Sequence, residues 1–269
     1  MLHWTCPICQ LPLLRLGQSS ACERGHSFDT AKEGYINLLT SNQKHSLTPG
    51  DSAAMIAARR TIHNAELYEP LAEVITSSVR THLTSGNVLD VGCGEGFYTG
   101  KVQLMCPNVD IAGVDISKPA IRIAAKTYKT IHYAVASSNN LPIGPSSVDF
   151  VFNVFAPTND NETNRVLADA GFLLEVGPAP GHLSQLRAAL YETPRKHKEL
   201  RSNIAGLKLA DSGQLEYVTA LDKPLIRAMI EATPMAHRGD PRNKEALFNR
   251  ESMAIDFAFS WRLYEKTHN

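Results

Sequence analysis

The stretch Val88-Leu89-Asp90-Val91-Gly92-Cys93-Gly94-Glu95-Gly96 sets the architecture of this chain. Its first half is a short apolar run, which is typical of a buried parallel strand. Its second half has a glycine at every second position, and a helical pattern follows from residue 97. Glycines are needed at such a turn where a Cβ would collide with a bound ligand. The stretch therefore predicts a strand, a ligand-binding turn and a helix.

Alternating strands and helices continue beyond this unit, which predicts an α/β fold built on a largely parallel sheet. Further strands are expected at residues 110–115, 131–135, 148–153 and 171–176. Residues 253–262 alternate large apolar with small or polar side chains, which predicts a strand of a terminal antiparallel hairpin. Ligands of open α/β sheets bind beyond the carboxyl ends of the strands. Phe155, Pro157 and His182 are therefore expected at the active end.

An acid ends the second expected strand, where a carboxylate can bond ribose hydroxyls. Asp115 lies 19 positions after Gly96, close to the spacing of about 20 found in nucleotide-binding units. A dinucleotide site usually has G-x-G-x-x-G, whereas this chain has G-x-G-x-G preceded by an acid. The combination resembles the first motif of class I S-adenosylmethionine-dependent methyltransferases. The resemblance implies S-adenosylmethionine as cofactor, bound by Asp90, Gly92, Gly94, Glu95, Gly96, Phe97, Tyr98, Asp115, Ser137 and Ser138.

Four metal-ligating residues stand near the N-terminus. Cys6, Cys9, Cys22 and His26 follow the pattern C-x2-C-x12-C-x3-H, with a short hairpin expected between the two pairs. Four filled positions are typical of a closed, structural zinc site and leave no position for a catalytic water. A segment of about 40 residues buries too little apolar surface to fold alone, and a metal would supply folding free energy. Fortuitous spacing is the disfavoured alternative.

The middle of the chain is expected to connect the two parts. Residues 41–50 are polar and end in Pro-Gly, which predicts a linker. Asp51-Ser52 predicts the start of a helix to about residue 65, whose Arg59-Arg60 pair is interpreted as a solvated face. A second helix is expected from Glu69, with an apolar stripe of Leu71, Ile75, Val79 and Leu83. The predicted organisation is a zinc module at 1–45, a helical linker at 46–84 and a class I (Rossmann-like) domain at 85–269.

Charge and hydropathy exclude other classes. The 269 residues carry 27 Lys+Arg and 27 Asp+Glu, so a uniformly basic nucleic-acid-coating protein is excluded. Residues 187–208 hold a local surplus of cations, interpreted as a solvated helix face or a phosphate contact. No apolar stretch reaches the length of a membrane span, and the start lacks a signal peptide's pattern. Five cysteines, an odd number, favour a reducing, cytoplasmic location.

The whole chain resembles the RlmA-type methyltransferases, which modify N1 of a guanine in a hairpin of large-subunit ribosomal RNA. Beyond the metal and glycine motifs, the resemblance lies in residues 27–39, including Lys32-Glu33-Gly34-Tyr35, and in Pro49-Gly50-Asp51-Ser52, residues 58–60, 135–138 and Phe155-Ala156-Pro157. It implies 23S ribosomal RNA as partner, a zinc module that grips the RNA, and a homodimer.

The chemistry requires that N1 of guanine lose its proton. General-base help is expected from a carboxylate, a histidine or a backbone carbonyl near residues 155–157, and His182 is one candidate. Phe155 is a candidate for stacking on an extracted base. Two alternatives stay open. One is a small-molecule methyltransferase whose zinc ribbon is purely structural, which Lys32–Tyr35 disfavours. The other is a non-catalytic zinc-ribbon RNA-binding protein, which the intact glycine motif disfavours.

Overall fold

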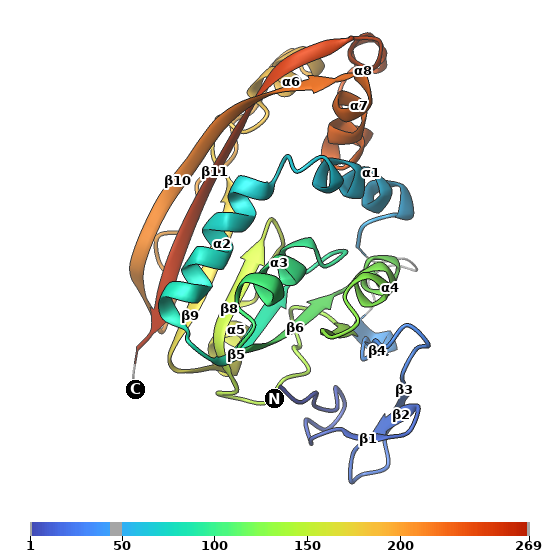
Figure 1. The fold of residues 1–269 in the computed structure, drawn as a ribbon, viewed down its shortest axis with the longest axis vertical. Coiled ribbons are helices and arrows are strands. Elements are labelled where there is room, and N and C mark those ends of the chain that lie inside the picture. The colour runs from blue at the N-terminus through green and yellow to red at the C-terminus, as the bar shows by residue number, and fades with distance from the viewer. Residues whose placement is uncertain (1, 44–49, 268–269) are drawn as a thin grey trace.

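An eight-stranded mixed sheet forms the centre of the molecule, and a small three-stranded sheet lies at the N-terminal end (Figure 1). The structure, a computed structural model, describes residues 2–43 and 50–267. Residues 44–49, most of the predicted polar linker, lie outside the described residues. The order of the large sheet is β10-β11-β9-β8-β5-β6-β7-β4. This arrangement confirms the α/β fold expected from the sequence.

The parallel strands β5 to β9 agree closely with the expected apolar runs, whereas the short strand β4 was not expected. The parallel strands are β5 (Gly86–Val91), β6 (Val109–Asp115), β7 (His132–Val135), β8 (Val148–Val154), β9 (Leu167–Pro178) and β4 (Ile36–Asn37). After β5 the chain builds β6 and β7 on one side and then crosses to β8 on the other. The carboxyl ends of β5 and β8 therefore meet at a topological switch point, where such sheets bind ligands.

A long antiparallel hairpin forms the other edge of the sheet. β11 (Ser252–Lys266) pairs with β9 over its second half and with β10 (Leu207–Asp222) along its whole length. The alternation at residues 253–262 is thereby confirmed as a strand. β10, its partner, was not anticipated. The hairpin extends past β9 and carries α7 (Lys223–Glu231) to a position beside α1 (Ala53–Asn64) (Figure 1).

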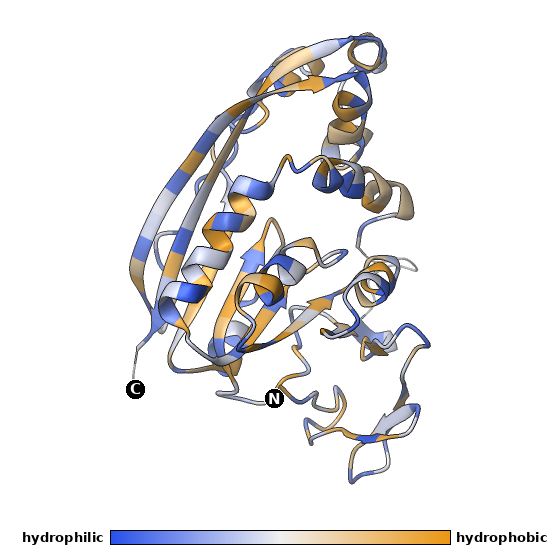
Figure 2. Cartoon of the chain, in the orientation of Figure 1, coloured by the Kyte–Doolittle hydropathy of each residue, from blue (hydrophilic) through white to orange (hydrophobic). Residues whose placement is uncertain are grey.

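The predicted pair of helices in the middle of the chain is confirmed. Ser52 caps α1, its side chain accepting a hydrogen bond from the backbone N–H of Met55 at 3.2 Å. α2 (Glu69–His82) buries the expected stripe of Leu71, Ile75 and Val79, and hydrophilic and hydrophobic residues alternate along it in Figure 2. The remaining helices are α3 (Phe97–Met105), α4 (Lys118–Thr127), α5 (Asp160–Val166), α6 (Ser184–Leu190), α8 (Pro241–Phe248) and two 3-10 turns, Ser41–Gln43 and Pro234–His237.

The N-terminal module packs against the eight-stranded sheet. Its strands β1 (Leu14–Leu16), β2 (Ser19–Ala21) and β3 (Ser27–Asp29) include the hairpin expected between the ligand pairs. Leu2 and Leu13 belong to the same buried cluster as Leu89 of β5. The division of the chain at residues 45 and 84 stays a prediction. Among the described residues, the buried clusters combine side chains from all three predicted parts.

Candidate active site and zinc site

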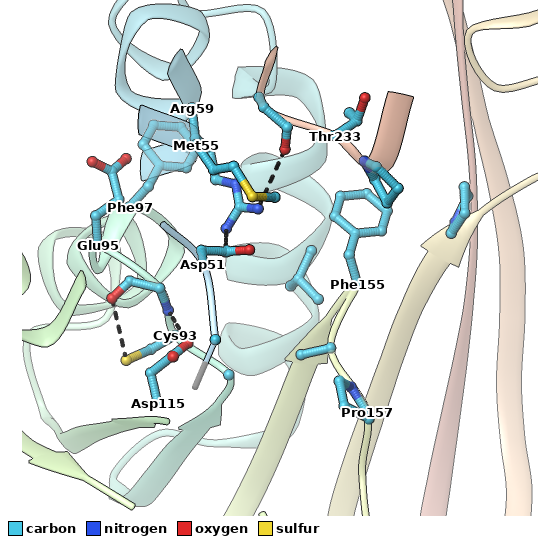
Figure 3. A pocket seen from close by; sticks show the side chains of 18 of the residues that line it. Asp51, Met55, Arg59, Cys93, Glu95, Phe97, Asp115, Phe155, Pro157 and Thr233 are labelled. Atoms are coloured by element: carbon cyan, nitrogen blue, oxygen red, sulfur yellow. Dashed lines mark hydrogen bonds and ion pairs between the residues drawn. The ribbon is translucent and has the colours of Figure 1, made fainter. Parts of the chain in front are cut away.

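A cavity of about 840 Å3 opens at the switch point, and two walls of different composition line it. One wall contains the glycine-rich turn and the carboxyl end of β6. The other contains aromatic and histidine side chains beyond the ends of β8 and β9. The two walls meet at Gly92 and Ala156, since a Cβ on Gly92 would lie 2.3 Å from that of Ala156. A molecule bound along the turn would therefore reach directly to the segment containing Phe155 (Figure 3).

The three motif glycines have different tasks. All three adopt positive φ angles of 83°, 56° and 85°. A Cβ on Gly96 would collide with the hydroxyl of Tyr133 at 2.6 Å, so Gly92 and Gly96 serve packing within the protein. A Cβ on Gly94 would meet only Nη1 of Arg59, at 3.7 Å. Gly94 is therefore the glycine that gives a ligand access to the backbone.

The two motif acids occupy different environments. Asp115 lines the cavity, where its oxygens accept hydrogen bonds from the backbone N–H groups of Gly94 (2.9 Å) and Ser117 (2.7 Å). Asp90 lies behind the turn, away from the cavity lining, and accepts a hydrogen bond from Oγ1 of Thr99 at 2.6 Å. Burial raises the pKa of Asp90 to about 8. Asp90 therefore ties β5 to α3 and does not face the cavity.

The other expected cofactor residues line the cavity as a group: Glu95, Phe97, Tyr98, Ser137 and Ser138. Glu95 accepts a hydrogen bond from Nδ1 of His63 at 2.6 Å, and Nε of Arg60 lies 3.3 Å from its other oxygen. The His63 ring stacks on Phe97 with centroids 4.1 Å apart. These contacts join α1 to the glycine-rich turn.

An aromatic wall faces the turn across the cavity. Phe155 is 45% exposed and has a φ of 56°, a left-handed conformation that is costly for a bulky residue. Its ring lies nearly parallel to that of His182, at 27° with centroids 6.2 Å apart. Tyr68 and Phe259 pack beside them. The surrounding packing keeps Phe155 in this strained conformation, and its ring forms a flat apolar surface on the wall that faces the glycine-rich turn (Figure 3).

His182 is buried and held in one orientation. Its Nδ1 accepts a hydrogen bond from the backbone N–H of Ala258 at 3.2 Å, so the neutral ring carries its proton on Nε2. Burial, with His197 and Arg187 nearby, lowers the pKa of His182 to about 3. In this state His182 is a hydrogen-bond donor, and the environment disfavours the general-base role considered from the sequence.

The four expected metal ligands come together. Their ligand atoms all lie within 4.8 Å of one another. A tetrahedral zinc with Zn–S of about 2.3 Å and Zn–N of about 2.0 Å places two sulfurs about 3.8 Å apart and a sulfur and a nitrogen about 3.5 Å apart. The Sγ atoms of Cys9 and Cys22 are 3.6 Å apart, and Nδ1 of His26 lies 3.5 Å from Sγ of Cys6 and 3.4 Å from that of Cys22. The pocket has the size and donor set of a structural zinc site.

Comparisons with known proteins agree with both sites. Residues 4–47 match the family model described as RlmA, N-terminal, a zinc ribbon, and residues 88–191 match a methyltransferase domain. A 23S rRNA (guanine(748)-N(1))-methyltransferase of Streptomyces fradiae is 32% identical over 244 residues, covering 88% of this chain and 86% of the relative. The chain belongs to this RlmA-type family of 23S rRNA (guanine-N1)-methyltransferases.

One further relative and one solved structure are similar to most of this chain. A Bacillus subtilis protein named "Putative 23S rRNA (guanine-N(1)-)-methyltransferase YxjB" is 32% identical over 273 residues, covering 93% of this chain and 92% of the relative. A solved structure from Bacillus halodurans, described as a "putative methyltransferase", has a TM-score of 0.50 at 15% identity, covering 72% of this chain and 98% of that one. The last likeness concerns the fold alone.

This RlmA-type enzyme uses S-adenosylmethionine and zinc, and its residues fit both. The cavity offers Gly94 as the open backbone position and Asp115 as a carboxylate beside it. In the metal pocket the four ligand atoms lie within 4.8 Å of one another, and the separations of 3.4 Å, 3.5 Å and 3.6 Å fit a tetrahedral zinc. No helix within the described ranges, 2–43 and 50–267, is long and apolar enough to span a membrane.

The sequence missed the contribution of α1 to the cavity. Asp51, Met55 and Arg59 all line it, together with residues 232–235 after α7. Arg59 was interpreted as part of a solvated helix face. That interpretation is wrong, because its guanidinium is 32% exposed, pairs with Asp51 and points toward the turn. The only local signal was a pair of arginines, Arg59 and Arg60, in the middle of a helix that is otherwise rich in alanine and isoleucine.

The basic segment at 187–208 is also organised differently from the expected helix face. α6 ends at Leu190, and no helix is present at residues 191–206. Arg187 is buried and donates to the backbone carbonyls of Arg195 (2.6 Å) and Pro180 (2.7 Å). Arg201 pairs with Asp160 and Glu175. Part of the positive charge therefore anchors this irregular segment beside the cavity.

Proposed function

We propose that this protein transfers a methyl group from S-adenosylmethionine to N1 of a guanine in a hairpin of 23S ribosomal RNA. One observation carries the proposal: a single cavity joins the glycine-rich turn to the surface of Phe155. A methyl donor on the turn and a flat base on the aromatic wall would then lie side by side. The names of the relatives supply the class of RNA and the acceptor atom.

The cofactor-binding roles are divided between the turn and its neighbours. Asp115 accepts ribose hydroxyls, because a carboxylate has about four acceptor sites and only two are used by Gly94 and Ser117. Ser137 and Ser138 border the adenine, while Glu95, Phe97 and Tyr98 form the wall against α1. Asp90 keeps the turn in place through Thr99.

The acceptor base is positioned by the aromatic wall. A guanine inside a hairpin must leave its stack to reach an active site, and stacking on an aromatic ring repays part of that cost. Phe155 supplies the ring, and Pro157 follows it at the mouth of the cavity. His182 donates from Nε2 to the guanine carbonyl oxygen. That contact favours the base after loss of the N1 proton.

The sulfonium methyl group is already activated by its positive charge, so holding the two reactants in line supplies most of the acceleration. The N1 proton passes to water, and a backbone carbonyl near residues 155–157 orients N1–H by accepting a hydrogen bond from it before the proton leaves. Neither step asks His182 to accept a proton, in agreement with the occupied Nδ1.

The zinc module is proposed to grip the RNA without taking part in methyl transfer. Ile8, Leu14 and Leu16 are each about 60% exposed on its outer surface, where unpaired bases could rest. A homodimer and a cytoplasmic location, both expected from the sequence, remain part of this proposal. Light scattering on the purified protein tests the former.

Nucleoside analysis of 23S ribosomal RNA tests the function. RNA from a strain that lacks the gene should have lost one N1-methylguanosine, and the purified enzyme with S-adenosylmethionine should restore it to that RNA. Unchanged N1-methylguanosine in the deletion strain would contradict the proposal. Methyl transfer to small metabolites but not to RNA would favour the small-molecule alternative.

A further inference from the structure

Charged side chains are distributed unevenly over the lining of the cavity. Within the described residues the acids that line it are Asp51, Glu95 and Asp115, and all three lie at or beside the glycine-rich turn. Away from the turn the described lining has no acid and carries four basic side chains, His182, Arg187, His197 and Arg238. The turn side therefore suits a cationic ligand, whereas the opposite end suits an anionic one.

Arg187 is a buried cation without an anionic partner. It lines the cavity and is 8% exposed. Its two Nη atoms donate to backbone carbonyls, and its Nε has no hydrogen-bond partner. No ion pair of Arg187 is present within residues 2–43 and 50–267, and burial lowers its pKa. A buried charge is normally paired, because the loss of its hydration is otherwise uncompensated. The missing counter-charge indicates an anionic ligand at this end of the cavity.

Arg238 lies at the same end of the cavity. The backbone N–H of Asp240 donates to the carbonyl of Leu190 at 3.4 Å, and a Cβ on Gly239 would lie 3.5 Å from that of Leu190. Leu190 is the last residue of α6, the helix that also contains Arg187. The exposed guanidinium of Arg238 makes no hydrogen bond or ion pair to the part of the chain that the structure describes. Its five N–H donors are therefore available to a ligand.

The basic end continues from the surface proposed for the guanine. The ring of His182 lies 6.2 Å from that of Phe155, and the ring of His197 lies 6.0 Å from that of His182, measured between centroids. Burial and then the charge of Arg187 lower the pKa of His197, so Arg187 lies close behind this ring. A nucleotide carries its phosphate one ribose away from its base. The phosphate of a guanosine stacked on Phe155 therefore extends toward these cations.

We propose that Arg238 and Arg187 form a site for the RNA phosphate next to the target guanosine. Arg238 donates to the phosphate oxygens at the mouth of the cavity, and Arg187 supplies a buried positive charge behind them. A guanidinium suits this task because its planar fork can bind two phosphate oxygens at once. This inference rests on the proposed function, which stacks the guanine on Phe155. The site holds the extracted nucleotide by its backbone and leaves recognition of the base to other contacts.

The salt dependence of methyl transfer tests this site, because every phosphate contact releases counterions from the RNA. Arg238→Gln is the test variant, since Arg187 also holds the backbone at Pro180 and Arg195. The substrate is 23S ribosomal RNA from a strain that lacks the gene. The kcat/KM of the full-length variant for this RNA should fall about tenfold at low salt, the loss of a charged hydrogen bond. The slope of log kcat/KM against log salt concentration should become less steep by about one unit. Arg238→Lys, which keeps the charge, should keep the slope.

Arg250→Gln is the matched control, because Arg250 is also exposed but lies outside the cavity lining. It should keep the rate and the salt slope of the wild type. Calorimetry should show unchanged binding of S-adenosylhomocysteine to Arg238→Gln, because the cofactor half of the cavity is intact. A wild-type slope in Arg238→Gln, an equal change in Arg250→Gln, or a loss of S-adenosylhomocysteine binding would overturn the phosphate site and leave the proposed function standing. A wild-type protein that does not methylate this RNA would overturn both proposals.

Discussion

Nδ1 of His182 accepts a hydrogen bond from the backbone N–H of Ala258, which joins the loop after β9 to the strand β11. This contact settles which ring nitrogen carries the proton of the neutral imidazole. With Nδ1 engaged and the ring buried, His182 meets the cavity as a donor. Its role in the reaction is therefore testable through pH.

Activity should show no inflection that belongs to His182. A general base of ordinary pKa would lose activity as pH falls through about 6.5, whereas the pKa of His182 is lowered to about 3. His182→Gln should lower the methyl-transfer rate about 10- to 100-fold, the worth of one hydrogen bond to developing charge. The pH profile of single-turnover methyl transfer should keep its shape between pH 5.5 and 8. A low-pH limb that disappears in His182→Gln would contradict the donor role.

Stability should respond to the same residue. Between pH about 3 and 6.5 the unfolded chain binds a proton at His182 that the folded chain does not, so the free energy of unfolding rises with pH in this range. The contribution of the neutral His182 ring to the free energy of unfolding is fully present above pH 6.5 and is lost as the pH falls toward 3. His182→Asn should reduce the slope by up to about 1.4 kcal/mol per pH unit. Denaturant titrations at pH 5, 6 and 7 measure it, and identical slopes in both proteins would contradict the lowered pKa.

The two motif acids should differ in their effect on the cofactor. Asp115→Ala should weaken binding of S-adenosylhomocysteine by about 1.5–3 kcal/mol, because it removes charged hydrogen bonds in the cavity. Asp90→Asn should have a much smaller effect, since Asp90 bonds Thr99 behind the turn. Calorimetry on the two variants makes the comparison. Equal losses would show that Asp90 also reaches the ligand.

Removing the ring of Phe155 should affect RNA more than cofactor. Stacking of a base on an aromatic ring stabilises a complex by about 1–3 kcal/mol. Phe155→Ala should therefore lower kcat/KM for RNA by the factor that corresponds to this free energy. Phe155→Tyr, which keeps the ring, is the matched control and should retain most activity. Binding of S-adenosylhomocysteine should be nearly unchanged in both. A Phe155→Ala variant whose kcat/KM for RNA equals that of the wild type would contradict the placement of Phe155 in the acceptor site.

Loss of zinc should act on RNA binding and on stability together. Cys22→Ser should release the metal and unfold the module, and RNA affinity should fall at least about tenfold, or about 1.4 kcal/mol. Because Leu2 and Leu13 belong to the same buried cluster as Leu89 of β5, the melting temperature of the remaining domain should fall as well. S-adenosylhomocysteine should still bind, since the metal ligands lie outside the cavity lining. Unchanged RNA affinity would exclude the module from substrate capture.

Local patterns were sufficient for the parts of the chain whose structure is local. Apolar runs at 88–91 and 148–153 predicted strands because burial on both faces of a parallel sheet demands such runs. The spacing of Cys6, Cys9, Cys22 and His26 predicted a metal pocket, because each of the two ligand pairs is presented by one tight turn. The glycine motif indicated a binding turn because its closely spaced glycines allow the backbone to approach a ligand. Each of these features is encoded within a few residues.

The tertiary structure decided which surfaces meet. Only long-range packing shows that Asp90 turns away from the cavity while Arg59, remote in sequence, enters it. The same holds for Nδ1 of His182, whose tautomer depends on a strand more than seventy residues later. The open edge strand β10 has few buried positions, so its half-polar sequence gave no clear strand signal. The sequence by itself determined the buried parallel strands β5 to β9, the helices α1 and α2, the zinc ligands and the family, because these depend on patterns and spacings along the chain. The surfaces for the cofactor and for the acceptor base, and the role of His182 as a hydrogen-bond donor, could be assigned only from the tertiary structure, because they depend on side chains that packing brings together.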